Sequence, residues 1–198
     1  PSELIHIGGD ERTKDRWKEC EHCQAMMKAQ GLESEEELQG YLVTRIEKFL
    51  NAQGRRIIGW DEILEGGVST SSTVMAWRGA KIGAYAAEHG HEVVMTPLPI
   101  CYFDFYQTQS REGEGLRIGG HINFQKVYAW DPFEGISDAA RKNIIGVQCN
   151  VWSEYLTDLS MYESQLLPRL GALCEVQWSV DRRDETTIRR KMENLRKF

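Results

Sequence analysis

Hydrophobic and polar residues alternate along this chain in a way that predicts short strands and helices in turn. Short apolar runs between glycine, proline or polar residues are typical of strands, and apolar residues three or four positions apart are typical of helices. We therefore expect strands at 4–9, 55–60, 72–77, 91–96 and 144–152, with residues 101–105 extending the fourth. We expect helices at 14–30, 34–54, 80–89, 137–143, 162–178 and 184–197, and a polar, glycine-rich loop at 110–120.

The segment 34–54 carries the clearest helix signal. Ser34 is followed three residues later by Glu37, which is the spacing of a capping box at a helix N-terminus. Gly54 stands where a helix is expected to end. Between them, apolar residues recur at helical spacing, at Leu38, Leu42, Ile46 and Phe49.

Strands that alternate with helices indicate a parallel sheet with helical crossovers, so the predicted fold class is α/β. The chain has 198 residues, enough for one core of good size, and no internal repeat or low-complexity tract divides it. In parallel α/β folds, ligands bind at the carboxyl ends of the strands. Functional side chains are therefore expected where the predicted strands end.

Aromatic and acidic residues gather at these strand ends. Aromatic faces cover the apolar faces of a pyranose ring and carboxylates accept hydrogen bonds from its hydroxyls, so the pattern predicts a sugar site. The alternative for any single tryptophan is a place at the rim of the core. The residues concerned are Asp10, Glu11, Trp60, Asp61, Glu62, Trp77, Arg78, Tyr102, Asp104, Trp152 and Glu154.

The first predicted strand is followed by two glycines and then by two adjacent acids, Asp10 and Glu11. Two ionised neighbours repel, and on a regular strand they would point to opposite faces. Either the pair lies in a solvated loop, or the strand ends here and both acids turn toward one site. Gly8 and Gly9 permit such a bend and leave room for a ligand near the backbone.

The composition excludes few classes of protein, but it narrows the range of binding partners. Hydrophobic residues make up 41% of the chain and charged residues 27%, which is ordinary for a globular protein. The net charge of −6 does not favour nucleic acid or an anionic membrane as a partner. No apolar run is long enough for a membrane span, and no signal peptide is present in these residues. The absence of an Asn-x-Ser/Thr sequon favours a bacterial source.

The five cysteines are an odd number, which argues against a full disulfide framework. Cys20 and Cys23 have the spacing of half a zinc site, but no second pair of ligands follows, so a helical turn with two thiols is the favoured interpretation. No metal ligand set, glycine-rich dinucleotide motif or P-loop occurs, so no cofactor is expected.

Five blocks resemble, in the same order, those of glycoside hydrolase family 20, the β-N-acetylhexosaminidases. That family has a (β/α)8 TIM barrel in which an Asp-Glu pair follows the fourth strand. The resemblance therefore implies a partial barrel with strands four to eight and their helices. Residues 1–198 would then be a single, incomplete domain from the C-terminal portion of the catalytic barrel. The blocks are HIGGDE at 6–11, GWDEIL at 59–64, MAWRG at 75–79, CYFDFYQ at 101–107 and GVQCNVWSE at 146–154.

The resemblance also implies a substrate-assisted, retaining mechanism, in which the 2-acetamido oxygen of the substrate attacks the anomeric carbon. Glu11 would be the general acid and base, and Asp10 would orient the acetamido group. Tyr102 would hydrogen-bond the acetamido oxygen. The two acids then need different pKa values, and an ionised Asp10 beside Glu11 favours this difference.

The remaining roles follow from the same resemblance. Trp60, Trp77 and Trp152 would form the walls of the acetamido pocket. Asp104 would help to position Asp10, and Glu154 would bind the outer sugar hydroxyls. Two further acids are interpreted as acidic residues at a helix N-terminus, and no direct catalytic role is expected for them. The two acids without a catalytic role are Asp61 and Glu62. For Arg78 two roles are open, orienting a carboxylate or lining the site. His6 is expected to be a strand residue that is hydrogen-bonded inside the barrel. Three tryptophans are expected to pack, namely Trp17, Trp130 and Trp178.

The expected function is hydrolysis of terminal, non-reducing β-linked N-acetylhexosamine residues of a glycan or oligosaccharide. One alternative is that this chain alone is an inactive barrel fragment with at most residual sugar binding. Such a fragment would self-associate through its open strand edges. A chitinase-like enzyme, which also uses acetamido assistance, is a weaker alternative. Bacterial relatives imply a secreted, periplasmic or outer-surface location.

Overall fold

The computed structural model describes residues 2–179, and the helix predicted at 184–197 lies outside these residues. Five strands form one sheet in the order β1-β2-β3-β4-β5, and the first three pair in parallel, with Ile5 opposite Ile57 and Gly59 opposite Val74. The strands are β1 Leu4–His6, β2 Arg56–Trp60, β3 Thr73–Ala76, β4 Val93–Met95 and β5 Ile144–Val147.

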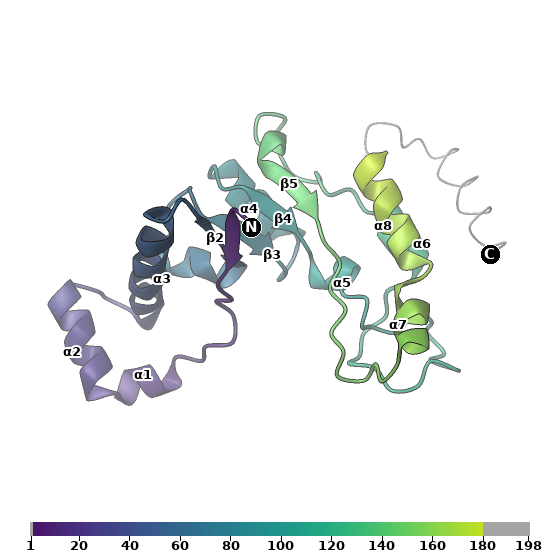
Figure 1. The fold of residues 1–198 in the computed structure, drawn as a ribbon, viewed down its shortest axis with the longest axis horizontal. Helices are drawn as coiled ribbons and strands as arrows, with labels where there is room; N and C mark the ends of the chain where they lie inside the picture. The colour runs from purple at the N-terminus through teal and green to yellow at the C-terminus, as the bar shows by residue number, and fades with distance from the viewer. Residues whose placement is uncertain (1, 180–198) are drawn as a thin grey trace. The chain divides into compact units, whose positions relative to one another are not determined.

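Helices follow the strands in the alternating order that the sequence predicts (Figure 1). The α/β class is therefore confirmed. The α-helices are α1 Asp15–Glu19, α2 Glu21–Gln30, α3 Glu35–Asn51, α4 Ala80–Glu88, α5 Leu98–Cys101, α6 Phe124–Ala129, α7 Leu159–Leu166 and α8 Arg169–Trp178, and the two 3₁₀ helices are η1 Asp61–Gly66 and η2 Arg141–Asn143.

The chain divides into two compact units. The first consists of Pro1–Val94 and Gly135–Ile145, and the second of Met95–Glu134 and Gly146–Phe198. That both belong to a single, incomplete domain stays a prediction.

The first unit is built on β3, whose four residues are all buried. Helix α3 lies against η1, and the two backbones meet at Gly40 and Gly66. A Cβ atom added to Gly40 would lie 2.0 Å from the Gly66 carbonyl oxygen, so no other residue fits here. The capping box at the start of α3 is confirmed, because the Ser34 hydroxyl accepts a hydrogen bond from the Glu37 backbone N–H at 3.2 Å.

The second unit has its core between α6 and α8, which pack against each other (Figure 1). Its fully buried apolar side chains include Phe103, Ile122, Val127, Tyr128 and Leu173. Helix α6 was not predicted, because six residues are too few to show a helical period.

Two predicted elements near the middle of the chain are wrong. Residues 101–105 do not continue a strand: α5 ends at Cys101, and Tyr102 makes a single parallel bridge to Asn150. The cause lies in the preceding segment, where the fixed φ of Pro97 and Pro99 suits the first turn of a helix. The helix predicted at 137–143 is a turn followed by the short η2.

Three predicted elements are shorter than expected. The helix predicted at 14–30 breaks at Cys20, whose extended backbone starts a second helix. The helix predicted at 162–178 breaks before α8, because Pro168 has no N–H to continue α7. Strand β5 ends at Val147 instead of at residue 152, and Ile145 in it is 46% exposed, so an apolar run did not mean a fully buried strand.

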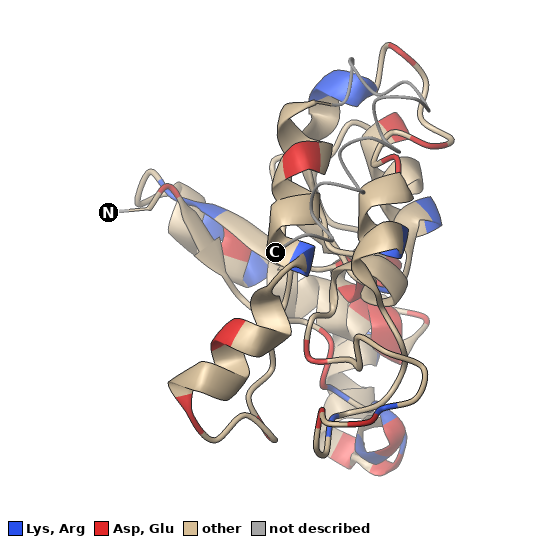
Figure 2. Ribbon diagram, turned by 90° about the vertical axis from the view of Figure 1, so that its right-hand side faces the viewer, with Lys and Arg blue, Asp and Glu red and all other residues tan. Residues whose placement is uncertain are grey.

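Acidic and basic residues are interspersed along the ribbon (Figure 2). Among residues 2–179, no helix is both long enough and apolar enough to cross a membrane.

Candidate active site

Asp10 and Glu11 lie in a bend that directly follows β1. The bend begins at Gly8 and Gly9, whose φ angles of +70° and +118° lie in the region that favours glycine. A Cβ atom on Gly9 would also lie 2.9 Å from Cγ2 of Ile63. The strand therefore ends before the two acids, as the sequence indicated. Asp10 is half-buried and Glu11 is exposed.

Hydrogen bonds to the glycine backbone hold this bend in place. The Trp60 backbone N–H donates to the Gly8 carbonyl at 2.9 Å, which extends the pairing of β1 with β2. The buried Gln39 side chain on α3 donates to the Gly9 carbonyl at 2.7 Å. The bend that carries the two acids is thus fixed from a strand and from a helix.

His6 precedes the bend and contacts Trp60. The two rings meet edge to face with centroids 5.1 Å apart, and His6 Nδ1 accepts a hydrogen bond from the Gly8 N–H at 3.1 Å. Burial lowers the pKa of His6, although the charge of Asp10 opposes this effect. The expected hydrogen bond is confirmed, and the ring remains exposed in this chain.

Asp61 and Glu62 hold Trp77, the tryptophan that follows β3. Asp61 is fully buried and accepts hydrogen bonds from the backbone N–H groups of Trp77, at 2.8 Å, and Arg78, at 3.0 Å. Glu62 accepts a hydrogen bond from the indole Nε1–H of Trp77 at 3.0 Å. Burial raises the pKa of Glu62 above its usual value. The two acids therefore set both the backbone and the ring of Trp77.

Sequence reasoning missed this role for Asp61 and Glu62. Both residues do lie in the first turn of η1, as expected for acids at a helix N-terminus. Their side chains, however, reach across to the end of the next strand. The available signal was the pair of acids after one strand beside the Trp-Arg pair after the following strand.

Arg78 extends this cluster by pairing with Asp61 and Glu65, so it orients carboxylates. Burial disfavours its charge, but the hydrogen bonds that Arg78 donates to the two acids outweigh that effect and raise the pKa of Arg78. Glu65 also pairs with Lys14 at 3.4 Å, and Lys14 lies 3.7 Å from Glu36. Through Lys14, the loop that follows Glu11 is joined to η1 and α3.

In the second unit, Tyr102 and Trp152 lie close together. Their ring centroids are 6.3 Å apart. Two hydrogen bonds with the backbone of Asn150 fix the backbone on either side of Tyr102. The Phe103 N–H donates to the Asn150 carbonyl at 2.7 Å, and the Asn150 N–H donates to the Cys101 carbonyl at 2.8 Å. Tyr102 is buried, whereas Trp152 is 43% exposed.

Asp104 is 2% exposed, and both of its carboxylate oxygens lack a hydrogen-bond partner in the described part of the chain. Burial, together with the charge of Glu154, raises the pKa of Asp104 to about 6. A buried polar group without a partner is costly and points to a role beyond stability. The carboxylate can accept hydrogen bonds from hydroxyl groups of a ligand or from water.

Arg169, on α8, holds the backbone on either side of Asp104. Its guanidinium is fully buried and donates to the carbonyls of Phe103 at 2.5 Å and Phe105 at 3.0 Å. It also stacks over the Phe103 ring at 4.8 Å and donates to the Ile122 carbonyl at 3.1 Å. Burial lowers the pKa of Arg169 to about 10. The sequence analysis did not identify this residue.

The predicted site residues thus divide between the units. The first unit gathers four of them at neighbouring strand ends, and the second gathers four around the segment 102–104 and the segment after β5. They are Asp10, Glu11, Trp60 and Trp77 in the first unit, and Tyr102, Asp104, Trp152 and Glu154 in the second.

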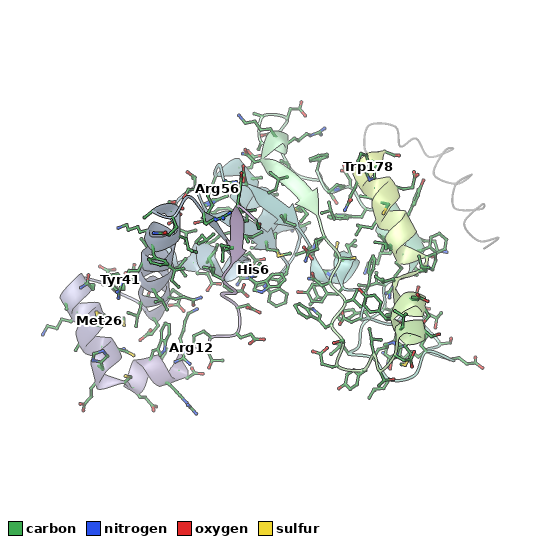
Figure 3. All side chains as sticks on the ribbon, viewed as in Figure 1. His6, Arg12, Met26, Tyr41, Arg56 and Trp178 are labelled. Carbon is green, nitrogen blue, oxygen red and sulfur yellow. The ribbon has the colours of Figure 1, made fainter. Side chains whose placement is uncertain are left out.

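Of the three tryptophans expected to pack, Trp130 is buried and Trp17 is half-buried, with the Arg12 guanidinium 4.8 Å from its ring centroid. The prediction is wrong for Trp178, which is 86% exposed at the end of α8 (Figure 3). Among residues 2–179, no cluster of three or more His, Cys, Asp or Glu side chains could hold a metal ion.

Comparison with known proteins places the chain in a family. Residues 1–181 match the family described as glycosyl hydrolase family 20, catalytic domain. The chain is 43% identical over 197 residues to a β-hexosaminidase of Porphyromonas gingivalis, covering 98% of this chain and 25% of that protein. It is 32% identical over 176 residues to a β-hexosaminidase of Vibrio furnissii, covering 87% of this chain and 29% of that protein.

A solved structure is similar as well. The exo-β-N-acetylglucosaminidase of Vibrio harveyi, in complex with N-acetylglucosamine, superposes with a TM-score of 0.85 at 30% identity, covering 98% of this chain and 31% of that one. This likeness and the parallel sheet confirm the partial barrel. The chain spans about a quarter to a third of the length of these relatives. It belongs to glycosyl hydrolase family 20 and represents part of the catalytic domain.

Proposed function

We propose that this chain is part of an enzyme that removes terminal, non-reducing β-linked N-acetylhexosamine from a glycan or oligosaccharide. The observation that carries the proposal is the adjacent Asp10–Glu11 pair on a glycine bend that is fixed by hydrogen bonds from β2 and α3. The names of the relatives, β-hexosaminidase and exo-β-N-acetylglucosaminidase, support the same activity.

Glu11 protonates the leaving glycosidic oxygen and then activates water. Its exposed side chain can be reached by a substrate. Asp10 orients the acetamido N–H, so that the acetamido oxygen attacks the anomeric carbon and no enzyme nucleophile is needed. Asp10 is half-buried, which limits the water that competes for its carboxylate.

Trp60 and Trp77 form apolar walls for the acetamido methyl group. Glu62 binds the indole N–H of Trp77, so the orientation of the ring is set before substrate arrives. The family resemblance supports two further roles: Trp152 forms another wall, and the Tyr102 hydroxyl donates a hydrogen bond to the acetamido oxygen. This arrangement holds the attacking oxygen in a reactive position.

The two carboxylates of the second unit bind sugar hydroxyls. Glu154 is exposed, as a group that contacts the outer hydroxyls must be. Asp104 has buried oxygens without partners in the described chain, and these accept hydrogen bonds when a ligand is present. We also keep the role that the resemblance gives to Asp104, which is to help position Asp10.

The test is hydrolysis of 4-nitrophenyl N-acetyl-β-D-glucosaminide by the full-length protein that contains this chain. We expect turnover, its loss in Glu11→Gln, and no comparable turnover of 4-nitrophenyl β-D-glucoside, which has no acetamido group. Equal rates on the two substrates would contradict the substrate-assisted mechanism. Full activity of Glu11→Gln would contradict the role of Glu11.

A second candidate applies to the isolated 198-residue chain, which we propose to be inactive and self-associating. Strand β1 is the first strand of the sheet, and Ile5 on it is 39% exposed. Uncovered strand edges pair with other chains. Light scattering should show dimers or larger species, and a monomer at high concentration would contradict this proposal.

A secreted, periplasmic or outer-surface location of the full-length protein also remains a proposal.

A further inference from the structure

Two cysteines meet where α1 gives way to α2. Cys20 ends α1 and is the N-cap of α2, with an extended backbone at φ −87° and ψ 109°. Cys23 lies in the first turn of the same helix, and its backbone N–H donates to Sγ of Cys20 at 3.4 Å. Both side chains are free thiols and partly exposed. The proposed glycosidase function uses neither of them.

We propose that Cys20 and Cys23 form a reversible dithiol–disulfide pair, with Cys20 as the attacking thiol and a disulfide as the oxidant. The Cys20 side chain folds back over the first turn of α2, so that its sulfur lies 3.4 Å from the backbone nitrogen of Cys23. A Cys-x-x-Cys pair at a helix N-terminus is also a setting in which a thiolate is stabilised.

The two thiols have different surroundings, which assigns them different parts in the exchange. The hydrogen bond from the Cys23 N–H lowers the pKa of Cys20 below its usual value. The hydrogen bond to Cys20 raises the pKa of Cys23. Two nearby charges act in smaller measure, since Glu21 raises the pKa of Cys20 and Arg12 lowers that of Cys23. Cys20 is therefore the better nucleophile, and Cys23 the thiol that completes the bond.

The three other cysteines, Cys101, Cys149 and Cys174, belong to the second unit. Burial raises the pKa of Cys101 and of Cys149. Cys174 is exposed on α8. In the part of the chain that the structure describes, no third His, Cys, Asp or Glu joins Cys20 and Cys23 in a metal site. The pair is therefore assigned to thiol–disulfide chemistry rather than to zinc.

The exchange balances in two steps. The Cys20 thiolate attacks one sulfur of an external disulfide, so that a mixed disulfide forms and one thiol leaves with a proton. Cys23 then gives up its proton and attacks the Cys20 sulfur, which releases the second thiol. The chain loses two hydrogen atoms, and the external disulfide is reduced to two thiols.

The probe is a series of glutathione buffers with increasing fractions of glutathione disulfide, applied to the full-length protein. After acid quenching and alkylation, peptide mass spectrometry reports each cysteine separately. We expect the peptide with Cys20 and Cys23 to lose two hydrogens as a unit, while the Cys101 peptide stays alkylated.

Two single variants test the assigned order. Cys23→Ser should accumulate a glutathione adduct on Cys20, because the second step is blocked. Cys20→Ser should form the adduct on Cys23 about tenfold more slowly than Cys23→Ser forms it on Cys20, because the Cys23 sulfur lacks the backbone N–H bond that lowers the pKa of Cys20. Cys174→Ser is the matched control and should leave the Cys20–Cys23 disulfide unchanged.

Two results would overturn the proposal. One is a pair of thiols that stay reduced, or that form separate adducts, at every buffer ratio. The other is protection of both thiols by added Zn²⁺ with no disulfide formed after the metal is removed. Neither result bears on the glycosidase proposal, because the measurement does not depend on turnover.

Discussion

The two units hold their site residues by opposite electrostatic means. In the first unit, the buried carboxylate of Asp61 and the half-buried carboxylate of Glu62 accept hydrogen bonds and so orient Trp77. In the second, the buried guanidinium of Arg169 donates to backbone carbonyls around Asp104. The first arrangement places side chains and the second places a loop. The difference shows that either carboxylates or a buried cation can position the residues at strand ends. The two units should therefore respond differently to mutation and to pH.

The largest expected effect comes from Arg169→Met, which removes the cation of the second unit. Four backbone carbonyls, among them those of Phe103 and Phe105, would lose a donor in a buried environment. We expect a loss of about 3–5 kcal/mol in the free energy of unfolding, measured by urea denaturation. Lys18→Met, at an exposed ion pair, is the control and should change stability by less than about 0.5 kcal/mol.

Asp104→Asn should raise the free energy of unfolding at neutral pH, whereas Arg169→Met lowers it. The folded pKa of Asp104, about 6, lies above the usual value of about 3.9, so the protonated form is favoured by folding. The stability contributed by this group is present below about pH 4 and is lost as pH rises through 6. The variant should therefore be more stable than the wild type at pH 8, by up to about 3 kcal/mol.

The check on Asp104 is the pH at which this difference disappears. Urea denaturation of both proteins should give similar free energies of unfolding near pH 4, a difference that grows between pH 4 and about pH 6, and a constant difference above that pH. A difference that stays constant from pH 4 to pH 8 would contradict the raised pKa. Substrate affinity should fall in the variant, because Asn cannot reproduce a carboxylate that accepts two hydroxyl groups.

Gly9→Ala tests the bend of the first unit. The alanine must adopt a φ near +118° and its Cβ would meet Ile63 at 2.9 Å, so stability should fall by about 1–3 kcal/mol. The two acids would also move, which should lower kcat. Gly31→Ala is matched, because Gly31 also has a positive φ of +67° but no atom lies within 4 Å of an added Cβ. It should cost about 1 kcal/mol and leave kcat unchanged.

The smallest effect is expected from Glu62→Gln. A glutamine can accept the indole hydrogen bond of Trp77 through its amide oxygen, so the ring should stay in place. Because burial raises the pKa of Glu62 and so disfavours its charged form, replacing it with a neutral glutamine should cost little stability. Glu62→Ala, which removes the acceptor, should raise KM. Equal KM values for the two variants would show that this hydrogen bond does not position Trp77.

The elements that the sequence predicted best are those with local signals. Helix α3 has a capping box and a regular apolar face, so its start could be placed from Ser34, although it ends at Asn51, three residues before the predicted Gly54. The glycine bend before Asp10 could be predicted equally well, because only glycine adopts its backbone angles easily. These features depend on residues a few positions apart.

The features that could not be predicted depend on distant contacts. Arg169 donates to a carbonyl 66 positions earlier, and nothing near it in the sequence distinguishes it from a surface arginine. The same holds for Asp61, whose partners lie 16 and 17 positions later on another strand end. The break at Cys20 was missed for a different reason, because an N-cap cysteine interrupts an otherwise continuous polar and apolar pattern.

The contact between Gly40 and Gly66 has a consequence for how variation in this family is interpreted. An added Cβ at either position would lie within 2.5 Å of backbone atoms, so even alanine is excluded. In a survey of random variants, both positions should tolerate as little change as Glu11, although their part is to let α3 and η1 approach. Intolerance to substitution alone would therefore assign these two glycines to the chemistry, and only the space around them shows that they belong to the scaffold.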